Sequence, residues 1–172
     1  METASTASLR AADTTRADLG TWMVVVAGFA LICYGVFFIV RNFTGFIELG
    51  LTPAHVGATP AAIRDFSPRL YNYISHLQVA IAGFIVVLGV ALISLAWNGM
   101  RHRARWAAWT VATVVIVAVT ITLPLHYVYG LATVGHLGTL YVDVLLLLAG
   151  SALSLRASKL SHEGSRSAAR FG

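Results

Sequence analysis

Three histidines and one aspartate are the side chains of this sequence that could carry chemistry. His126 and His136 flank a short turn, whereas His76 and Asp143 lie within long apolar runs. Imidazole nitrogens together with a carboxylate are ligands that zinc, copper and iron accept. Two imidazoles on facing helices could instead be the axial ligands of a haem b. The same groups could also exchange protons with a bound small molecule, as in a quinone pocket.

The same four side chains also have a purely structural explanation. Histidines at helix ends can bond loop carbonyls or lipid phosphates, and Asp143 could pair with a protonated histidine or with Arg69. A single hydrogen bond from Tyr127, Tyr129 or Thr139 would also account for a buried carboxyl group. The sequence leaves both explanations open.

The composition is that of an all-α polytopic membrane protein. The chain has 172 residues, of which 58% are hydrophobic and 11% are charged, whereas a soluble domain carries about 25% charged residues. Its apolar residues form blocks long enough to cross a bilayer, which takes about 20 residues per helix. The net charge is +5, but the basic residues stand at the ends of apolar runs, which excludes a nucleic-acid-binding face. Cys33 is the only cysteine, so dithiol chemistry of the quinone-reductase type is excluded.

Four apolar runs are predicted to form transmembrane helices within one domain over residues 19–156. The first run is too long for the core of a signal peptide and lacks a small-residue cleavage site, which predicts an uncleaved span. Residues 1–18 are predicted to be a flexible tail and residues 157–172 a basic tail. The four predicted spans are 22–40, 68–97, 106–125 and 134–155.

The connection over residues 41–67 contains the pairs Thr52-Pro53 and Thr59-Pro60 and ends at Ser67-Pro68. A hydroxyl side chain followed by proline is typical of a helix start, because the hydroxyl caps the first turn and proline needs no partner there. The pairs predict short helices near 53–57 and 60–66, followed by the second span.

The distribution of lysine and arginine predicts the orientation of the chain. The two tails and the turn at 98–105 hold nine of these residues, whereas the 41–71 segment and the 126–133 turn hold three. The positive-inside rule then places both termini in the cytoplasm and makes the chain a multi-pass protein of the plasma membrane. The result is an up-down four-helix bundle with the 41–67 loop outside.

This threading is expected to bring His76, His126 and His136 to the same depth at the outer side, from three different helices. His136, Asp143 and Gly150 are seven residues apart, so they share one face of the last span. Asp143 would lie about 10 Å deeper than His136 and point into the bundle. The expected site has the three histidines as metal or cofactor ligands, and Asp143 as a further ligand, a catalytic group or a proton acceptor.

The chain contains the pattern Pro68-Arg69-Leu70, Ile74-Ser75-His76, Gly83, Gly89, Arg105-Trp106-Ala107, Leu125-His126-Tyr127, Gly130 and Gly135-His136-Leu137. This pattern, spread over roughly residues 42 to 150, resembles a set of small bacterial four-span integral membrane proteins of unassigned function. Such proteins often carry an aspartate directly after the first histidine, where this chain has Leu77. The resemblance implies the four-span fold and no mechanism.

These observations predict a membrane protein with an outward-facing His/Asp pocket that binds a metal, a redox cofactor or a small amphiphile. It would act as a small membrane enzyme or as a subunit of a membrane redox complex. The alternative is a non-catalytic accessory or scaffold subunit that contacts the lipid bilayer and partner membrane subunits or further copies of itself. One intramembrane acid and no internal repeat argue against a channel or transporter.

Overall fold

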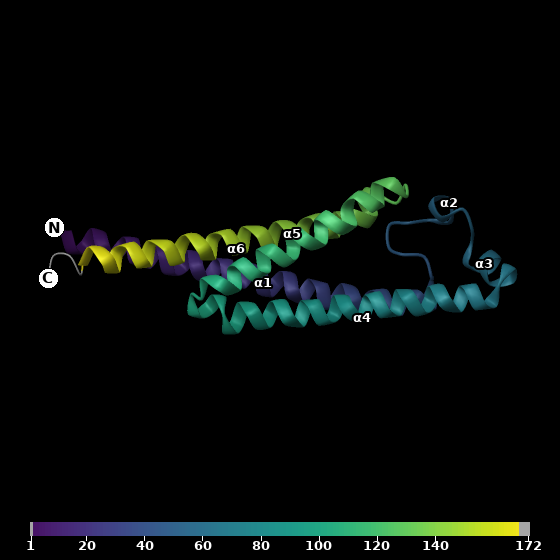
Figure 1. Cartoon of the computed structure of the whole chain (residues 1–172), viewed down its shortest axis with the longest axis horizontal. Helices are drawn as coiled ribbons and strands as arrows, with labels where there is room; N and C mark the ends of the chain where they lie inside the picture. Colours follow the sequence, from purple (N-terminus) through teal and green to yellow (C-terminus); the bar gives the residue numbers. More distant parts are fainter. Residues whose placement is uncertain (1, 169–172) are drawn as a thin grey trace.

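The computed structural model describes residues 2–168, including the side chains of residues 15–159. This part of the chain folds into helices and turns and contains no strand (Figure 1). The elements in chain order are α1 (Glu2–Thr44), α2 (Pro53–Val56), α3 (Pro60–Phe66), α4 (Pro68–Asn98), the 3₁₀ turn η1 (Met100–His102), α5 (Arg105–Val128) and α6 (Val134–Ala168).

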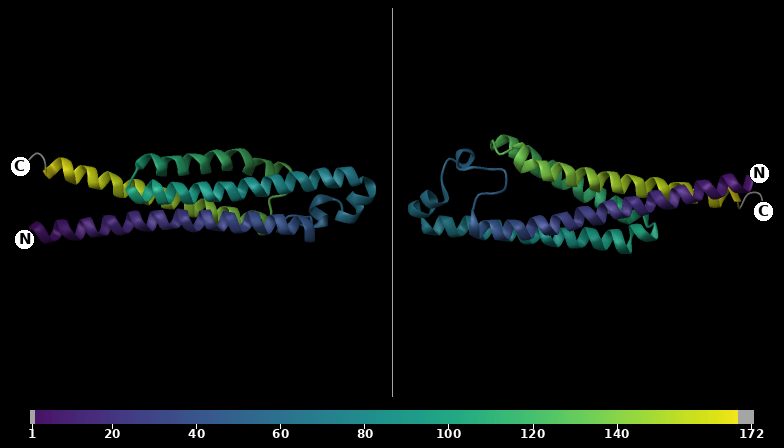
Figure 2. Two further views of the ribbon diagram at one scale, coloured as in Figure 1. Left: turned by 90° about the horizontal axis from the view of Figure 1, so that it is seen from below. Right: turned by 180° about the vertical axis from the view of Figure 1, so that it is seen from behind.

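Four of these helices contain segments that are long and apolar enough to cross a membrane, which confirms the predicted all-α, multi-pass class. The segments are Thr15–Thr44, Pro68–His102, Arg105–Val128 and Val134–Lys159. Their order is up-down, because α1 begins and α6 ends at the same end of the molecule (Figures 1 and 2). We refer to that end, together with η1, as the terminal end. The opposite end, with residues 45–67 and the turn between α5 and α6, is the loop end.

Helix α1 is the central helix, since it packs against both α4 and α6. Glycines allow these contacts to form between backbones: a Cβ atom added to Gly28 would lie 2.9 Å from the Gly89 carbonyl oxygen, and one added to Gly20 would lie 2.6 Å from that of Gly150. Small residues let helices approach closely in a membrane, where van der Waals packing drives association. Helix α5 packs mainly against α6 and makes little contact with α4.

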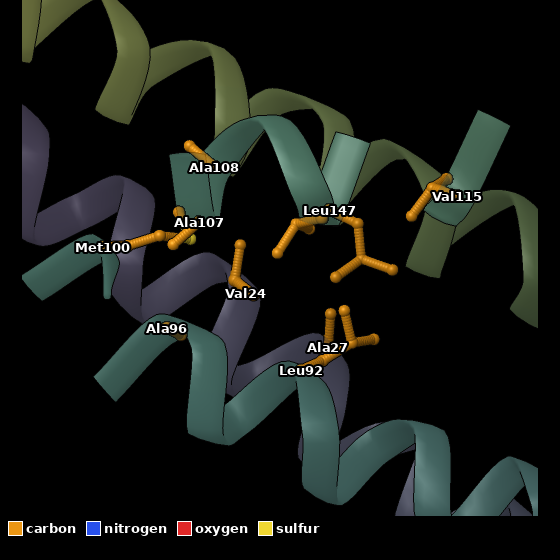
Figure 3. Packing of buried hydrophobic residues seen from close by; sticks show 10 residues of the cluster. Val24, Ala27, Leu92, Ala96, Met100, Ala107, Ala108, Val115 and Leu147 are labelled. Atoms are coloured by element: carbon orange, nitrogen blue, oxygen red, sulfur yellow. The ribbon is translucent and has the colours of Figure 1, made fainter. Parts of the chain in front are cut away.

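The hydrophobic core lies toward the terminal end, where all four long helices meet (Figure 3). Small and medium side chains fill it, as the close approach of the helices requires. Its members are Val24, Ala27, Leu92, Ala96, Met100, Ala107, Ala108, Val111, Val115 and Leu147.

The loop end contains the two short helices that the Ser/Thr-Pro pairs predicted. The Thr59 hydroxyl accepts a hydrogen bond from the Ala62 N–H at 3.1 Å, and the Ser67 hydroxyl accepts one from the Leu70 N–H at 3.2 Å. The Thr52 hydroxyl instead bonds the His55 imidazole at 2.8 Å. Two of the three hydroxyls thus cap helices in the expected way.

The first and last helices extend beyond the predicted spans. Helix α1 begins at Glu2, within the stretch predicted to be a flexible tail, and α6 continues through the predicted basic tail as far as Ala168. Alanines are frequent in the first segment and alanine, serine and long polar side chains in the last. Alanine, lysine, arginine and glutamate are good helix formers, so a helix that starts in the apolar span can propagate into them.

Candidate functional site

His136 is the centre of a polar cluster at the loop end. Its side chain is buried, with 8% of the residue exposed. The imidazole Nδ1 lies 3.0 Å from the Leu49 carbonyl oxygen, and Nε2 lies 3.4 Å from a Glu48 carboxyl oxygen. Both partners come from the segment that follows α1, so the cluster joins that segment to the first turn of α6.

Thr133 fixes the start of α6 and holds the same segment in place. Its hydroxyl accepts a hydrogen bond from the His136 N–H at 3.1 Å and donates one to the Gly50 carbonyl oxygen at 2.9 Å. The first bond caps the helix, which satisfies an N–H that has no partner within it. One hydroxyl therefore sets both the helix start and the position of the loop.

Gly50 allows the loop to lie directly on the helix start. Its φ angle is +78°, which favours glycine, and a Cβ atom there would overlap the backbone of Gly135 and His136. A Cβ atom on Gly135 would in turn lie 3.2 Å from the Gly50 Cα. This glycine contact brings the Leu49 carbonyl and the Glu48 carboxyl group within reach of the imidazole.

The two contacts of His136 determine where one proton lies. The Leu49 carbonyl can only accept, so Nδ1 carries a hydrogen and Nε2 is left to face Glu48. A bare Nε2 lone pair and a carboxylate at this distance would repel each other. A hydrogen bond between Nε2 and the carboxyl group therefore requires one proton between them.

His126, at the end of α5, is the second histidine of the cluster. Its Nδ1 lies 2.8 Å from the Thr122 carbonyl oxygen, so this nitrogen donates and the Nε2 lone pair is available to a ligand. The His126 and His136 rings have centroids 5.2 Å apart and planes inclined by 40°. The structure therefore places these two histidines side by side, as the sequence predicts.

Asp143 is buried on the same face of α6 as His136, with 9% of the residue exposed. Its Oδ1 atom has no hydrogen-bond partner among the described residues. Tyr127, which was one candidate partner, bonds the Tyr141 hydroxyl at 3.0 Å. Seven residues of helix separate Asp143 from His136, a distance of about 10 Å along the axis, so the carboxyl group lies below the cluster.

His76 is exposed on α4 and does not join the other two histidines. Over residues 15–159, no three His, Cys, Asp or Glu side chains are placed to hold a metal ion together. The reason is that α4 makes little contact with α5, and the two helices diverge toward the loop end (Figure 1), so α4 lies away from the helices that carry His126 and His136. Of the expected set of His76, His126, His136 and Asp143, only His126 and His136 lie together in the cluster.

Sequence reasoning missed Glu48, which takes the place beside His136 that we expected a histidine or Asp143 to fill. Glu48 is the only acidic residue between Asp18 and Asp65, and the apolar Ile47 and Leu49 flank it. An isolated acid next to apolar residues in the loop between two spans could have been recognised as a partner for a histidine. The close contact of Gly50 with α6 could not, because glycine is common in any loop.

The sequence matches no protein-family model, no curated protein and no solved structure. The chemistry of the cluster has to come from its own groups, which are two imidazole Nε2 atoms and the Glu48 carboxyl group. Such groups accept hydrogen bonds and protons from a hydroxyl group, and their lone pairs can also bind a cation.

Proposed function

We propose that this protein binds a quinol-type amphiphile at the outer side of the plasma membrane and accepts its protons, as a small enzyme or as a subunit of a membrane redox complex. The observation that carries the proposal is the histidine pair with Glu48. The His126 Nδ1 bonds a backbone carbonyl, which leaves its Nε2 lone pair to a ligand, and the His136 Nε2 faces the Glu48 carboxyl group at 3.4 Å. Both arrangements suit a ligand that donates hydroxyl protons.

The proton balance of a quinol fits the cluster. Oxidation of a quinol to a quinone releases two protons and two electrons. The His126 Nε2 takes one proton, and the His136–Glu48 pair takes the other, because it has two proton sites and one proton suffices for the hydrogen bond between them. The two electrons pass to a redox centre of a partner subunit. Asp143 is the next carboxyl group along α6 and would receive a proton that moves inward.

The surroundings of the cluster suit an apolar ring that arrives from the bilayer. Val128 and Val134 lie at the ends of the two helices that carry the histidines and are 75% and 89% exposed. Tyr127 and Tyr129 are exposed nearby and would offer aromatic faces. A quinol reaches such a surface laterally through the lipid, with its hydroxyl group directed at the imidazoles.

The proposal is tested with the full chain in lipid nanodiscs and a short-chain ubiquinol. We expect saturable binding that His126→Ala weakens by about tenfold or more, since a hydrogen bond to an ionisable group is lost. His76→Ala is the matched control and leaves binding unchanged, because that histidine is exposed on α4. Circular dichroism verifies that each variant folds. Equal binding by wild type, His126→Ala and His136→Gln would refute the proposal.

The orientation in this proposal comes from the excess of lysine and arginine in the tails and the 98–105 turn. In a Cys33→Ser background, Ala54→Cys in α2 should react with a membrane-impermeant maleimide added to intact cells. Asn98→Cys, at the end of α4, should react only after the cells are opened. The reverse pattern would invert the topology and place the histidine pair on the cytoplasmic side.

A metal centre is the second candidate. Metal-binding histidines commonly donate their other ring N–H to a carbonyl or carboxyl group, and both His126 and His136 donate Nδ1–H to backbone carbonyls. An ion there would take the two Nε2 atoms and complete its coordination with water or a bound ligand, since no third His, Cys, Asp or Glu side chain over residues 15–159 is placed to join them. Elemental analysis of the purified protein decides this: about one equivalent of zinc, copper or iron that His126→Ala removes would favour the metal over the quinol.

An accessory role is the alternative that α4 favours. His76 is exposed, and a Cβ atom added to Gly83, two helical turns away, would contact nothing within 4 Å. An imidazole above an open glycine is a surface against which a helix of a partner subunit would pack. Photocrosslinking from position 83 in native membranes would identify that partner, and quinol binding by the isolated chain would then be absent.

A further inference from the structure

A cavity lies at the terminal end of the molecule, between α1 and the junction of α4 with η1. The histidine pair lies at the opposite end, on α5 and α6. It has a volume of about 240 Å³ and is lined by Asp18, Thr21, Trp22, Trp97 and Arg101. These residues come from the first part of the apolar segment of α1 and from the junction of α4 with η1. The cavity is smaller than the roughly 300–1,000 Å³ of a site for a drug-sized ligand, so its volume suits a compact polar group.

Two tryptophans and an arginine form an ordered wall of this cavity. The Trp22 and Trp97 rings meet edge to face, with centroids 6.0 Å apart and an interplanar angle of 79°. The Arg101 guanidinium group stacks over the Trp97 ring, 4.4 Å from its centroid. Stacking holds the guanidinium group in one place while its N–H groups remain able to donate.

The cavity presents one negative and one positive group that do not neutralise each other. Asp18 and Arg101 both line it, yet no ion pair within 4 Å joins them in the described part of the chain. Both residues are exposed. An acid and a guanidinium group set apart around one space fit a ligand that itself carries an anion and a cation at a short separation.

The position of the cavity indicates the source of such a ligand. Tryptophan and arginine lie here at the end of two apolar segments, which is the depth of the lipid headgroups. Trp22 and Trp97 are 54% and 43% exposed, so the cavity is open toward the surrounding lipid. A phospholipid headgroup can occupy it while its acyl chains lie along the apolar surfaces of α1 and α4.

We propose that this cavity binds the phosphoethanolamine headgroup of a phospholipid. The phosphate accepts hydrogen bonds from the Arg101 guanidinium group, and the ammonium group donates to the Asp18 carboxylate and contacts the Trp22 face. Guanidinium groups suit phosphate in shape and charge, and aromatic faces attract ammonium groups. The site is independent of the histidine pair, so it stands whether or not the protein binds a quinol.

The test uses the full chain in mild detergent and native mass spectrometry with phosphatidylethanolamine and phosphatidylglycerol. Wild type should bind phosphatidylethanolamine more tightly, since only that lipid carries the ammonium group. Asp18→Asn should weaken phosphatidylethanolamine binding by about tenfold and leave phosphatidylglycerol binding unchanged. Arg101→Gln should weaken the binding of both lipids to a similar extent.

Arg103→Gln is the matched control, because Arg103 follows directly after η1 and does not line the cavity. It should leave both affinities unchanged. Equal binding of the two lipids by wild type, or binding that is insensitive to both Asp18→Asn and Arg101→Gln, would overturn the proposal. Soluble phosphoethanolamine is added as a competitor: complete displacement of the lipid at equal concentration would show that the site takes a free metabolite and would overturn the lipid assignment.

Discussion

The two ends of the helical bundle are built on different principles. At the terminal end, glycine contacts and the apolar core join α1 to α4 and α6, and direct backbone approach replaces polar bonds. At the loop end, α4 and the α5–α6 pair diverge (Figure 1), and hydrogen bonds from Thr133 and His136 join the loop to α6. The histidine pair therefore lies away from the apolar core in which the four helices meet.

This difference implies that stability and chemistry reside in separate regions. Apolar contacts in a membrane are specific only where side chains fit closely, and the core supplies that fit. The loop end buries Phe46, Ile47, Leu51 and Leu137, but none of them belongs to the core cluster where the four helices meet. The position of the loop against α6 depends also on individual hydrogen bonds and one glycine contact. Substitutions at the terminal end should unfold the whole chain, whereas substitutions at the loop end should change the site and leave the helices in place.

The largest effect is expected at Gly89. Its Cβ atom would lie 2.5 Å from the Gly28 carbonyl oxygen, so Gly89→Leu should separate α1 from α4 and destabilise the protein by about 3 kcal/mol. The measurement is the unfolding transition in mixed micelles with increasing SDS. Gly83→Leu, on the same helix with nothing within 4 Å, should change stability by less than about 0.5 kcal/mol. Similar losses for both variants would mean that this contact does not hold the fold.

Gly50→Ala should have the next largest effect, and it should be confined to the loop end. A Cβ atom there combines strain at a φ of +78° with overlap against Gly135 and His136, which should destabilise the loop by about 2 kcal/mol. Faster hydrogen exchange over residues 45–51, with unchanged exchange in α1 and α4, is the expected readout. Gly57→Ala is the control, because φ is +77° there but nothing lies within 4 Å, and strain alone should contribute about 1 kcal/mol.

Thr133→Val should have a smaller effect on stability and a clear effect on the site. It removes the cap on the His136 N–H and the bond to the Gly50 carbonyl, a loss of about 1 kcal/mol. Ubiquinol binding should weaken because the segment that carries Glu48 is released. Thr139→Val, an exposed threonine on the same helix, is the control for the change of side chain. Unaltered ubiquinol binding in Thr133→Val would separate the loop from the proposed function.

The sequence was sufficient for the helices because their signals are local. Long apolar runs and Ser/Thr-Pro pairs act within a few residues, so α2, α3 and α4 begin close to where the sequence predicts. The arrangement of the helices depends instead on which pairs of glycines from different helices come into contact. Gly28 and Gly35 lie seven residues apart on one face of α1 and both meet α4, but a glycine spacing does not indicate which helix packs on it. The scarce contact between α4 and α5, which separates His76 from the histidine pair, likewise has no local signal.

The site was predictable where its contacts are local in the sequence and not where they are distant. His126 and His136 lie on either side of one short turn, so their proximity follows from the turn itself. Glu48 lies far from His136 in the sequence and reaches it through the contact between Gly50 and Gly135. A contact between two glycine backbones has no side-chain pattern, so nothing in the sequence indicates it.

Asp143 provides the sharpest test of the separation between the two ends, because its effect on stability should have the opposite sign. Its buried Oδ1 atom has no partner in the described structure, so removal of the carboxyl group should stabilise the protein. We expect Asp143→Val to raise the free energy of unfolding in mixed micelles by about 1 kcal/mol. Asp143→Asn keeps the shape and removes only the charge, so its stability should lie between those of wild type and Asp143→Val.

The functional readout of these variants should move in the opposite direction. If Asp143 receives protons from the histidine pair, both variants lose this proton transfer when the redox centre of the partner subunit takes the two electrons of ubiquinol, yet they still bind ubiquinol at His126. A group retained at a cost in stability is typical of functional sites, where activity and stability conflict. Lower stability in Asp143→Val would instead identify the carboxyl group as a structural element, and the functional region would then end at the first turn of α6.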